Sequence, residues 1–360
     1  MTDLRKGLIT AGLIFLGTGI SFSIGMMTAG FLLLILAYLL KPLPWSLPKY
    51  FLFFYFFLMT YSLNALLVTR SLKPLQDIFS DYWYFLLLPL FFSLVEEKEK
   101  ELFLKTLRYA FLLAALYAVF QGLTGINFYK YKLEPKLHLW KFPVYMALGT
   151  FNHHLTFGGQ MMGLSLLFRK RKLFFLAGAA ALFLAVPHSA WIGFFAALFV
   201  YIVFARKKYA GLLFLLPFVI LAVFPAPRKL FLSKMGERTA IWQAGLDMFK
   251  KNPLQGIGEG CYTELFDRDY RSSFRYPADG ARCHAHNQYI HILASGGIFP
   301  LIFFLLFLFF FVRDIFFLTG SPVVLSFLIA SLFQNYITDG ENAVLFWTAS
   351  ALILKFRSCD

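Results

Sequence analysis

Apolar blocks follow one another along most of this chain, separated by short connections that carry basic and aromatic residues. Most blocks approach the length that a helix needs to cross the hydrocarbon core of a bilayer, roughly 17–25 residues. The pattern predicts twelve such helices, at residues 8–23, 25–40, 50–69, 82–95, 103–122, 145–168, 173–186, 189–205, 209–224, 288–312, 322–336 and 343–354. Several are short, and the pair at 173–186 and 189–205 is expected to be re-entrant or strongly bent.

One long polar segment, from Phe224 to Asn287, interrupts the apolar blocks. Within it, Arg238–Lys251 predicts an amphipathic helix, because its apolar residues fall on one stripe, and Asn252-Pro253 ends that helix. The glycine-rich stretch Pro253–Gly260 that follows predicts a flexible corner.

The fold class that we expect is an all-α polytopic membrane protein. It has about twelve transmembrane helices and one large outer loop that contains short amphipathic helices. A helical body at residues 1–224 precedes the loop at residues 225–287, and C-terminal helices at residues 288–360 follow it. The three parts form one membrane-embedded unit.

Composition agrees with a membrane protein. The chain is 59% hydrophobic and only 15% charged, which is more apolar than a soluble domain of this size requires. Its net charge of +15 would suit nucleic-acid binding, but about half of its 34 Lys and Arg residues lie in connections on one side of the membrane. By the positive-inside rule this side is cytoplasmic, so both termini face the cytoplasm and the long loop faces outward. We therefore expect no nucleic-acid partner.

The three cysteines do not form a metal-binding pattern. Cys261 and Cys283 share the outer loop, where a disulfide can persist, but the sequence leaves their pairing open. A site made of His284, His286 and His291 is conceivable, yet the last two are five residues apart, which is a poor spacing for metal ligands on a helix. We expect neither a metal nor a cofactor.

Basic side chains in the outer loop are candidates for binding an anion. Arg268, Arg271, Arg275 and Arg282 lie close together in the sequence. Arginine binds phosphate through two parallel hydrogen bonds and keeps its charge when partly desolvated. The alternative is a solvated face balanced by the neighbouring aspartates.

Histidines mark several predicted outer ends of helices. His284 and His286 precede the helix that begins near Gln288, and a neutral imidazole there can act as a base or as a hydrogen-bond partner of phosphate. His153 and His154 are expected about eight residues below the outer end of their helix, where they line a cavity or pack against each other. His188 lies at the outer surface.

The remaining polar groups lie in other outer connections. Arg70 and Lys73 occupy the first of these, and Asn335, Asp339, Glu341 and Asn342 occupy the last. We expect all these elements to converge on one outward-facing site.

The order of these residues resembles the O-antigen ligase and O-antigen polymerase superfamily. The resemblance rests on Arg238-x-x-Ile-Trp242-x-x-Gly, on Asn252-Pro253-Leu-x-Gly256-x-Gly258-x-Gly260, and on His286-Asn287 followed after nine residues by Gly297. Two positions depart from the family pattern. His188 stands where an arginine is usual, which puts one phosphate contact in doubt, and Pro300 stands in place of a glycine.

The resemblance implies a glycosyltransferase at the periplasmic face of the bacterial inner membrane. Its donor would be a glycan linked to a polyprenyl diphosphate, its acceptor a lipid A-core sugar or another glycan, and membrane lipids would surround it. We expect transfer to be inverting and independent of metal, because arginines can hold the departing diphosphate.

Roles for individual residues follow from this interpretation. His286 and Arg238 are the candidate catalytic residues. Diphosphate binding is expected from Arg70, Lys73, Arg275, Arg282 and His188, and cavity lining from His153, His154, His284 and Asn287.

Three functions remain open at this stage. The first is a ligase that moves a finished O-antigen chain onto the lipid A-core, and the second is a polymerase of the same superfamily. The third is a membrane transporter or flippase, which predicts an internal repeat and charges at mid-membrane. We find no repeat in the sequence, and most polar candidates lie near the outer surface, so we favour a ligase.

Overall fold

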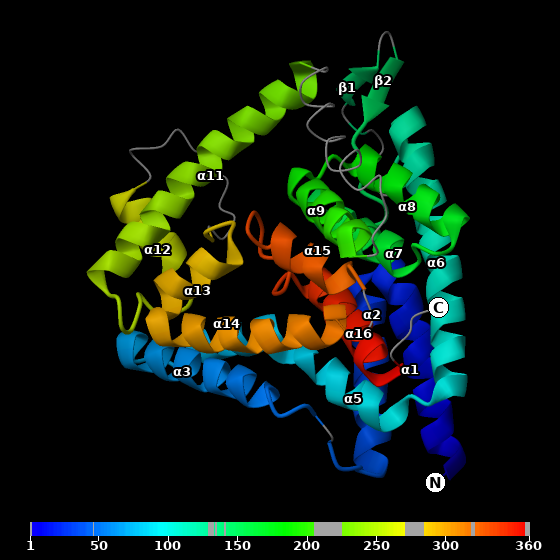
Figure 1. Ribbon diagram of the computed structural model, residues 1–360, viewed down its shortest axis with the longest axis horizontal. Helices are drawn as coiled ribbons and strands as arrows, with labels where there is room; N and C mark the ends of the chain where they lie inside the picture. The colour runs from blue at the N-terminus through cyan, green and yellow to red at the C-terminus, as the bar shows by residue number, and fades with distance from the viewer. Residues whose placement is uncertain are drawn as a thin grey trace.

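The computed structural model describes residues 2–45, 47–128, 133, 135–139, 142–204, 225–270, 284–317 and 321–356. These residues are mostly helical (Figure 1). Among them, three helices are long and apolar enough to cross a membrane, at Phe51–Thr69, Glu97–Thr124 and Ile298–Phe316. The apolar helices at Ile24–Leu40, Lys172–Ala185 and His188–Phe204 are shorter. The total of twelve spans stays a prediction.

Most predicted apolar blocks coincide with helices. These are α1 (Thr2–Phe22), α2 (Ile24–Leu40), α3 (Phe51–Thr69), α5 (Leu87–Leu94), α6 (Glu97–Thr124), α7 (His154–Leu167), α8 (Lys172–Ala185), α9 (His188–Phe204), α14 (Ile298–Val312), α15 (Val323–Ala330) and α16 (Gly340–Phe356). A 3₁₀ turn at Trp83–Leu86 precedes α5, and a π-helical turn at Arg313–Phe317 extends α14. The block predicted at 209–224 lies outside the described residues.

Helix α7 lies in the interior of the helical body. Every residue from Thr156 to Leu167 is buried, and the helix packs against α8, α9, α15 and α16. Its glycines allow this close packing, because a Cβ at Gly158 would lie 2.2 Å from Cγ of Pro187. A helix that is covered on all sides needs no polar face.

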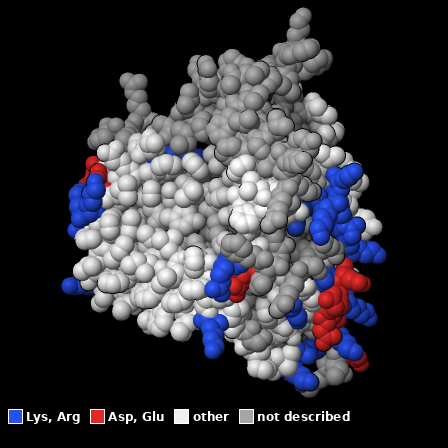
Figure 2. Space-filling model, in the orientation of Figure 1, with Lys and Arg blue, Asp and Glu red and all other residues white. Residues whose placement is uncertain are grey.

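Helices α3 and α14 lie side by side along one flank of the molecule (Figure 1). Phenylalanine rings interlock between them, with centroids 5.0 Å apart for both Phe54–Phe307 and Phe57–Phe304. Their outward faces expose large apolar side chains such as Leu63 and Phe309. Figure 2 shows a broad uncharged area over this flank, with most charged side chains gathered toward the sides of the view. Such a surface suits contact with lipid.

The two strands β1 (Pro135–Leu139) and β2 (Phe142–Tyr145) correct the expectation of an all-α fold. They pair antiparallel, with Leu139 opposite Phe142. The sequence Lys-Leu-His-Leu alternates polar and apolar residues, and only two residues separate the strands. Both features favour a β-hairpin in a connection for which we predicted no strand.

Three helices of the polar region form a smaller core of their own. They are α11 (Pro225–Lys251), α12 (Tyr262–Asp269) and α13 (Gln288–Gly296). Ile241 and Met248 of α11 pack there with Phe266 of α12 and Ala294 of α13. Helix α11 has 27 residues, so it is longer than the predicted Arg238–Lys251. It begins at a proline, which suits a first helical turn, and continues to the predicted stop.

The glycine-rich turn at Pro253–Gly260 is a fixed structure, contrary to the predicted flexible corner. The N–H groups of Ile257 and Gly258 donate to the carbonyls of Ala294 and Ser295, both at 2.9 Å. These carbonyls belong to the end of α13, which would otherwise lack partners. Gly256, Gly258 and Gly260 all have positive φ, which the turn requires.

The same turn divides the predicted helix 288–312 into α13 and α14. Gly297 separates the two with φ 82° and ψ −168°, a conformation that is open almost only to glycine. A Cβ at this position would lie 2.4 Å from the carbonyl oxygen of Leu254, and the N–H of Ile298 donates to Pro253 at 3.0 Å. Close packing of the turn therefore forces the break.

Candidate functional site

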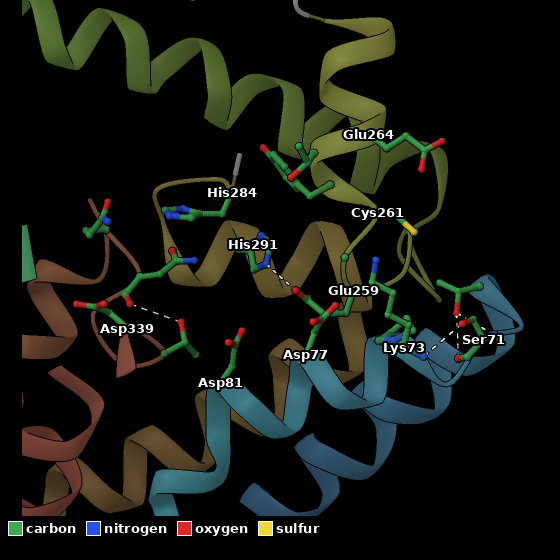
Figure 3. Close-up of a pocket in the computed structure, with 18 residues that line it drawn as sticks. Ser71, Lys73, Asp77, Asp81, Glu259, Cys261, Glu264, His284, His291 and Asp339 are labelled. Atoms are coloured by element: carbon green, nitrogen blue, oxygen red, sulfur yellow. Dashed lines mark hydrogen bonds and ion pairs between the residues drawn. The ribbon is translucent and has the colours of Figure 1, made fainter. Parts of the chain in front are cut away.

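A pocket of about 560 Å³ lies where the polar segments meet (Figure 3). Its lining comes from four places in the chain: the corner between α3 and α4 (Lys73–Tyr82), the turn and α12 at residues 259–264, the segment from His284 to α13, and the connection between α15 and α16. All four places belong, at least in part, to predicted outer connections or to the predicted outer loop. The structure thus brings together segments that are far apart in the sequence.

Helix α4 forms the acidic wall of the pocket. Asp77 and Asp81 are four residues apart, so they share one face of the helix, and Figure 3 shows both pointing into the pocket. Ile78 and Tyr82 lie on the other side and are buried. The amphipathic pattern of α4 therefore fixes the carboxylates toward the cavity.

Glu259, supplied by the glycine-rich turn, forms a buried pair with His291 of α13. The Glu259 carboxylate accepts from the His291 Nε2–H at 3.3 Å and from the hydroxyl of Tyr61. Burial alone would raise the pKa of Glu259, but His291 and these hydrogen bonds outweigh it and leave the pKa lowered. Burial acts to lower the pKa of His291, but Glu259 raises it overall. The pair therefore holds its proton on His291.

His286 adopts a strained backbone conformation directly before α13. Its φ is 46°, which is uncommon for a residue with a side chain. Its N–H donates to Nδ1 of His284 at 3.1 Å. The next residue, Asn287, is the N-cap of α13, and its side-chain oxygen accepts from the N–H groups of Tyr289 and Ile290. Strain of this kind concentrates at functional positions.

A hydrogen bond to Gln334 determines which nitrogen of His286 is basic. The His286 Nδ1 lies 2.7 Å from Oε1 of Gln334. An amide oxygen can only accept, so Nδ1 carries the hydrogen and Nε2 carries the lone pair in the neutral ring. Gln334 also lines the pocket. His286 is thereby held at the pocket's edge as an acceptor of protons.

Asp339 contributes a carboxyl group that stays partly protonated near neutral pH. Desolvation, with a smaller effect of Glu341, raises its pKa to about 7. Its carboxylate also accepts from Thr156 at 3.2 Å and from the side chain of Asn342. These contacts connect the pocket to the first turn of α7.

Among the residues named from the sequence, Lys73, His284, His291, Asn335 and Asp339 line the pocket. Burial, followed by the neighbouring His286, His291 and Arg238, lowers the pKa of His284 well below its ordinary value, so this ring is neutral. The charge of Arg238, which α11 carries, is thus felt at His284. Arg70 ends α3 between two residues of the lining, Thr69 and Ser71, with φ 52°.

His153 and His154 lie at the end of α7, which corrects the prediction that they are eight residues inside a helix. Helix α7 begins at His154, and the His153 ring caps it by accepting from Leu155 N–H at 3.3 Å. The residues before them form turns, which their Gly149 and Asn152 favour. His188 begins α9 and packs on Trp191. None of these three histidines belongs to the described lining of the pocket.

Some predicted residues cannot be placed. Arg275, Arg282 and the proposed disulfide partner Cys283 lie outside the described residues. Arg268 is exposed and pairs with the adjacent Asp269 at 2.7 Å, which agrees with a solvated face for that arginine.

The sequence analysis missed most of the acidic lining. Asp77, Asp81, Glu259 and Glu264 were not singled out, and Gln334 was not named at all. The i, i+4 spacing of Asp77 and Asp81 on a polar helix face was a usable signal. No sequence signal pointed to Glu259, because its position depends on the conformations of three glycines.

A second hollow, an apolar groove of about 770 Å³, lies along α14 and α15. It is lined by Tyr289, Leu301, Leu305, Leu308, Phe309, Val312, Arg313, Leu328 and Leu332. Tyr289 stands at its start, only three residues after His286 in the sequence. The linings of the groove and of the pocket thus both include residues of the same short segment.

Comparison with protein families identifies one match. The model of the O-antigen ligase family matches residues 173–305, a range that includes Glu259 and the histidines of the pocket. This match confirms the resemblance found in the sequence and supports membership of the O-antigen ligase superfamily. The comparison with curated proteins found no match.

Proposed function

We propose that this chain, which carries an O-antigen ligase domain, is a membrane glycosyltransferase of the ligase type. It transfers a glycan from a polyprenyl diphosphate to a hydroxyl of a lipid A-core sugar at the periplasmic face of the inner membrane. The observation that carries the proposal is the His286–Gln334 hydrogen bond of 2.7 Å, which presents Nε2 as a base at the edge of a polar pocket.

The chemistry requires one proton acceptor and one site for a leaving anion. The acceptor hydroxyl gives its proton to His286 Nε2, and its oxygen forms the new bond to the anomeric carbon. The bond from that carbon to the diphosphate oxygen breaks, and its electron pair leaves with the diphosphate. Attack opposite the leaving group inverts the anomeric centre.

Arg238 is the described residue best suited to hold the leaving diphosphate. Its positive charge contributes to the lowered pKa of His284. Guanidinium stays charged and can bind two phosphate oxygens at once. Arg70, Lys73, Arg275, Arg282 and His188 remain proposed diphosphate contacts, and no metal is needed for this step.

The apolar groove offers a place for the carrier lipid. Its walls are leucine, phenylalanine and valine side chains of α14 and α15, and it begins at Tyr289 beside the catalytic segment. A polyprenyl chain lying there would keep its diphosphate near His286. This arrangement favours a lipid-linked donor over a soluble one.

Replacement of His286 tests the proposal in purified, full-length enzyme with lipid-linked donor and lipid A-core. We expect His286→Ala to reduce transfer by at least about 100-fold, because a positioned base contributes about that much or more. Asp247→Ala on α11, which pairs with Lys250 and is not part of the described pocket lining, is the control and should transfer normally. Undiminished transfer by His286→Ala would rule out this role.

A deletion strain distinguishes ligase from polymerase. If the chain is a ligase, the strain loses all long-chain glycan from its lipid A-core and accumulates lipid-linked polymer. Single repeat units on the core would instead identify a polymerase. Transfer by purified enzyme should persist in EDTA, and loss of transfer there would contradict a metal-independent reaction.

A further inference from the structure

His284 is a partly buried histidine of the pocket lining that has no task in the proposed reaction. It lies two residues before His286, and the two imidazole rings meet edge to face with their centroids 4.3 Å apart. The backbone N–H of His286 donates to Nδ1 of His284 at 3.1 Å. His284 thus holds the backbone of the proposed base, whereas Gln334 holds its ring.

This hydrogen bond determines the protonation of the His284 ring. A backbone N–H can only donate, so Nδ1 of His284 must carry a lone pair. The neutral ring then has its hydrogen on Nε2, and a doubly protonated ring cannot accept the bond at all. The contact with His286 therefore exists only while His284 is neutral.

The backbone of His286 needs a contact of this kind. Its φ of 46° lies in the left-handed region, which is unfavourable for a residue with a Cβ and persists only where the surrounding structure holds it. Asn287 follows as the N-cap of α13, and its side chain accepts from the N–H groups of Tyr289 and Ile290. The cap therefore fixes the chain after His286, and the bond to His284 fixes the chain before it.

A fixed positive charge lies close to His284 on the same wall of the pocket (Figure 3). It belongs to His291, whose ring centroid is 6.4 Å from that of His284 and whose Nε2–H donates to Glu259 at 3.3 Å. A nearby positive charge disfavours a second one, so the charged His291 opposes protonation of His284. Burial lowers the pKa of His284 most, and His286 and His291 lower it further.

We propose that His284 is a positioning residue, which fixes the backbone of His286 through its neutral ring. The buried pair of Glu259 and His291 has the task of keeping that ring neutral. The inference rests on the proposed function, because the positioning matters only if His286 is the base. The reaction then requires an accepting atom on residue 284 and no other property of a histidine there.

Two replacements of His284 separate the accepting atom from the ring. Kinetics of purified full-length enzyme in lipid nanodiscs, with lipid-linked donor and lipid A-core, compare them. We expect His284→Leu to lower kcat by roughly 10–100-fold, as loss of an orienting partner does, with both KM values changed by less than about threefold.

His284→Asn is the matched rescue. The side-chain oxygen of asparagine accepts readily from the backbone N–H two residues later, so kcat should return to within about threefold of the wild type. Equal kcat of the Leu and Asn variants would overturn the proposal, because the accepting atom would then make no difference. Unfolding temperatures of both variants show whether a low kcat reflects loss of folded protein.

The protonation of His284 can be measured without any transfer reaction. Solid-state NMR of the full-length protein labelled with ¹⁵N-histidine distinguishes the two neutral tautomers from the charged ring. The His284 signals are identified by their absence from His284→Asn. At neutral pH we expect a ring with its hydrogen on Nε2 alone, and a hydrogen on Nδ1 would overturn the proposal.

A double-variant cycle tests the task of His291. His291→Gln removes the charge beside His284 and keeps a side chain that can donate to Glu259. We expect this change to lower kcat about tenfold in the wild-type background but only about twofold in His284→Asn, which has no ring to protonate. An equal loss in both backgrounds would contradict the assigned task of the Glu259–His291 pair.

The two proposals fail in different ways. Undiminished transfer by His286→Ala refutes the proposed function, whatever tautomer His284 has. Loss of transfer in His286→Ala, together with equal kcat in the two His284 variants, refutes the positioning residue and leaves the proposed function standing.

Discussion

The pocket and the apolar groove adjoin the same segment, residues 284–297, yet they differ in almost every physical property. The pocket is walled by carboxylates and histidines, of which Glu259 and His291 are hydrogen-bonded to each other. The groove is walled by leucine and phenylalanine, with Tyr289 and Arg313 at its ends. A polar group suits the first and a hydrocarbon chain suits the second. The contrast teaches that one short segment can border both a polar site and a lipid-binding groove.

Gln334 offers the sharpest way to disturb the pocket and leave the groove intact. Gln334→Leu removes the acceptor that fixes His286, so transfer should fall by roughly 10–100-fold, as for other orienting partners. Gln334→Glu still accepts from Nδ1 and should retain most activity. Rates with saturating donor and acceptor measure this. Equal activity of the two variants would show that the hydrogen bond is unimportant.

Filling the groove should weaken binding of the donor and leave binding of the acceptor unchanged. Leu305→Trp places bulk among the groove side chains, and we expect the donor KM to rise about tenfold with the acceptor KM unchanged, since apolar contact with the lipid is lost. Leu63→Trp on α3 is the control, because Leu63 is similarly exposed but outside the groove. A rise in both variants would indicate a general effect of bulk in the lipid-facing surface.

Gly297 lies between α13 and α14, and its replacement should destabilise the packing of the turn at Pro253–Gly260 against it. Gly297→Ala requires an unfavourable backbone conformation and brings a Cβ against Leu254, so we expect a destabilisation of about 1–3 kcal/mol. Gly7→Ala is the control, because a Cβ there meets nothing within 4 Å. Thermal unfolding in nanodiscs compares the two. Equal unfolding temperatures would contradict the tight packing of the turn on this glycine.

Asp339 should give the smallest effect, seen only as a dependence on pH. Its pKa is about 7 in the folded protein and roughly 3.9 in an unfolded chain. The folded state therefore binds more protons between these values, so its stabilising contribution is complete below about pH 4 and is lost as pH rises through 7. Asp339→Asn lacks this dependence.

Unfolding temperatures of the Asp339 pair at pH 5, 6 and 7.5 check that prediction. The wild type should lose a few degrees relative to Asp339→Asn as pH rises, a size that corresponds to roughly 1–2 kcal/mol. A difference that stays constant over this range would mean that the carboxyl is already ionised at pH 5.

The helices were predictable because long apolar blocks have few alternatives in a membrane. The edges of most blocks agree with the described helices, and the stop at Asn252-Pro253 coincides with the end of α11. The exceptions are places where local conformation is set by distant contacts. The break at Gly297 depends on Leu254, and the hairpin at 135–145 depends on a two-residue connection within an aromatic segment.

The candidate site was predictable in outline and less so in its charge. The sequence placed Lys73, His284 and Asp339 in connections that converge, because each follows or precedes an apolar block on the same side. It gave no sign that Glu259 would face His291 or that Gln334 would face His286, since both contacts join separate parts of the chain. A count of basic residues therefore suggested a cationic pocket, whereas the described lining is mainly acidic.

Photo-crosslinking tests the place of the carrier lipid most directly. A photoreactive amino acid is placed at Leu305 in the groove or at Ser71 on the pocket rim, and each full-length protein is irradiated with radiolabelled polyprenyl-diphosphate-linked glycan. We predict that the polyprenyl chain crosslinks at Leu305 in the groove and not at Ser71 in the pocket. Capture of the polyprenyl chain at Ser71, with none at Leu305, would contradict the assignment of the carrier lipid to the groove.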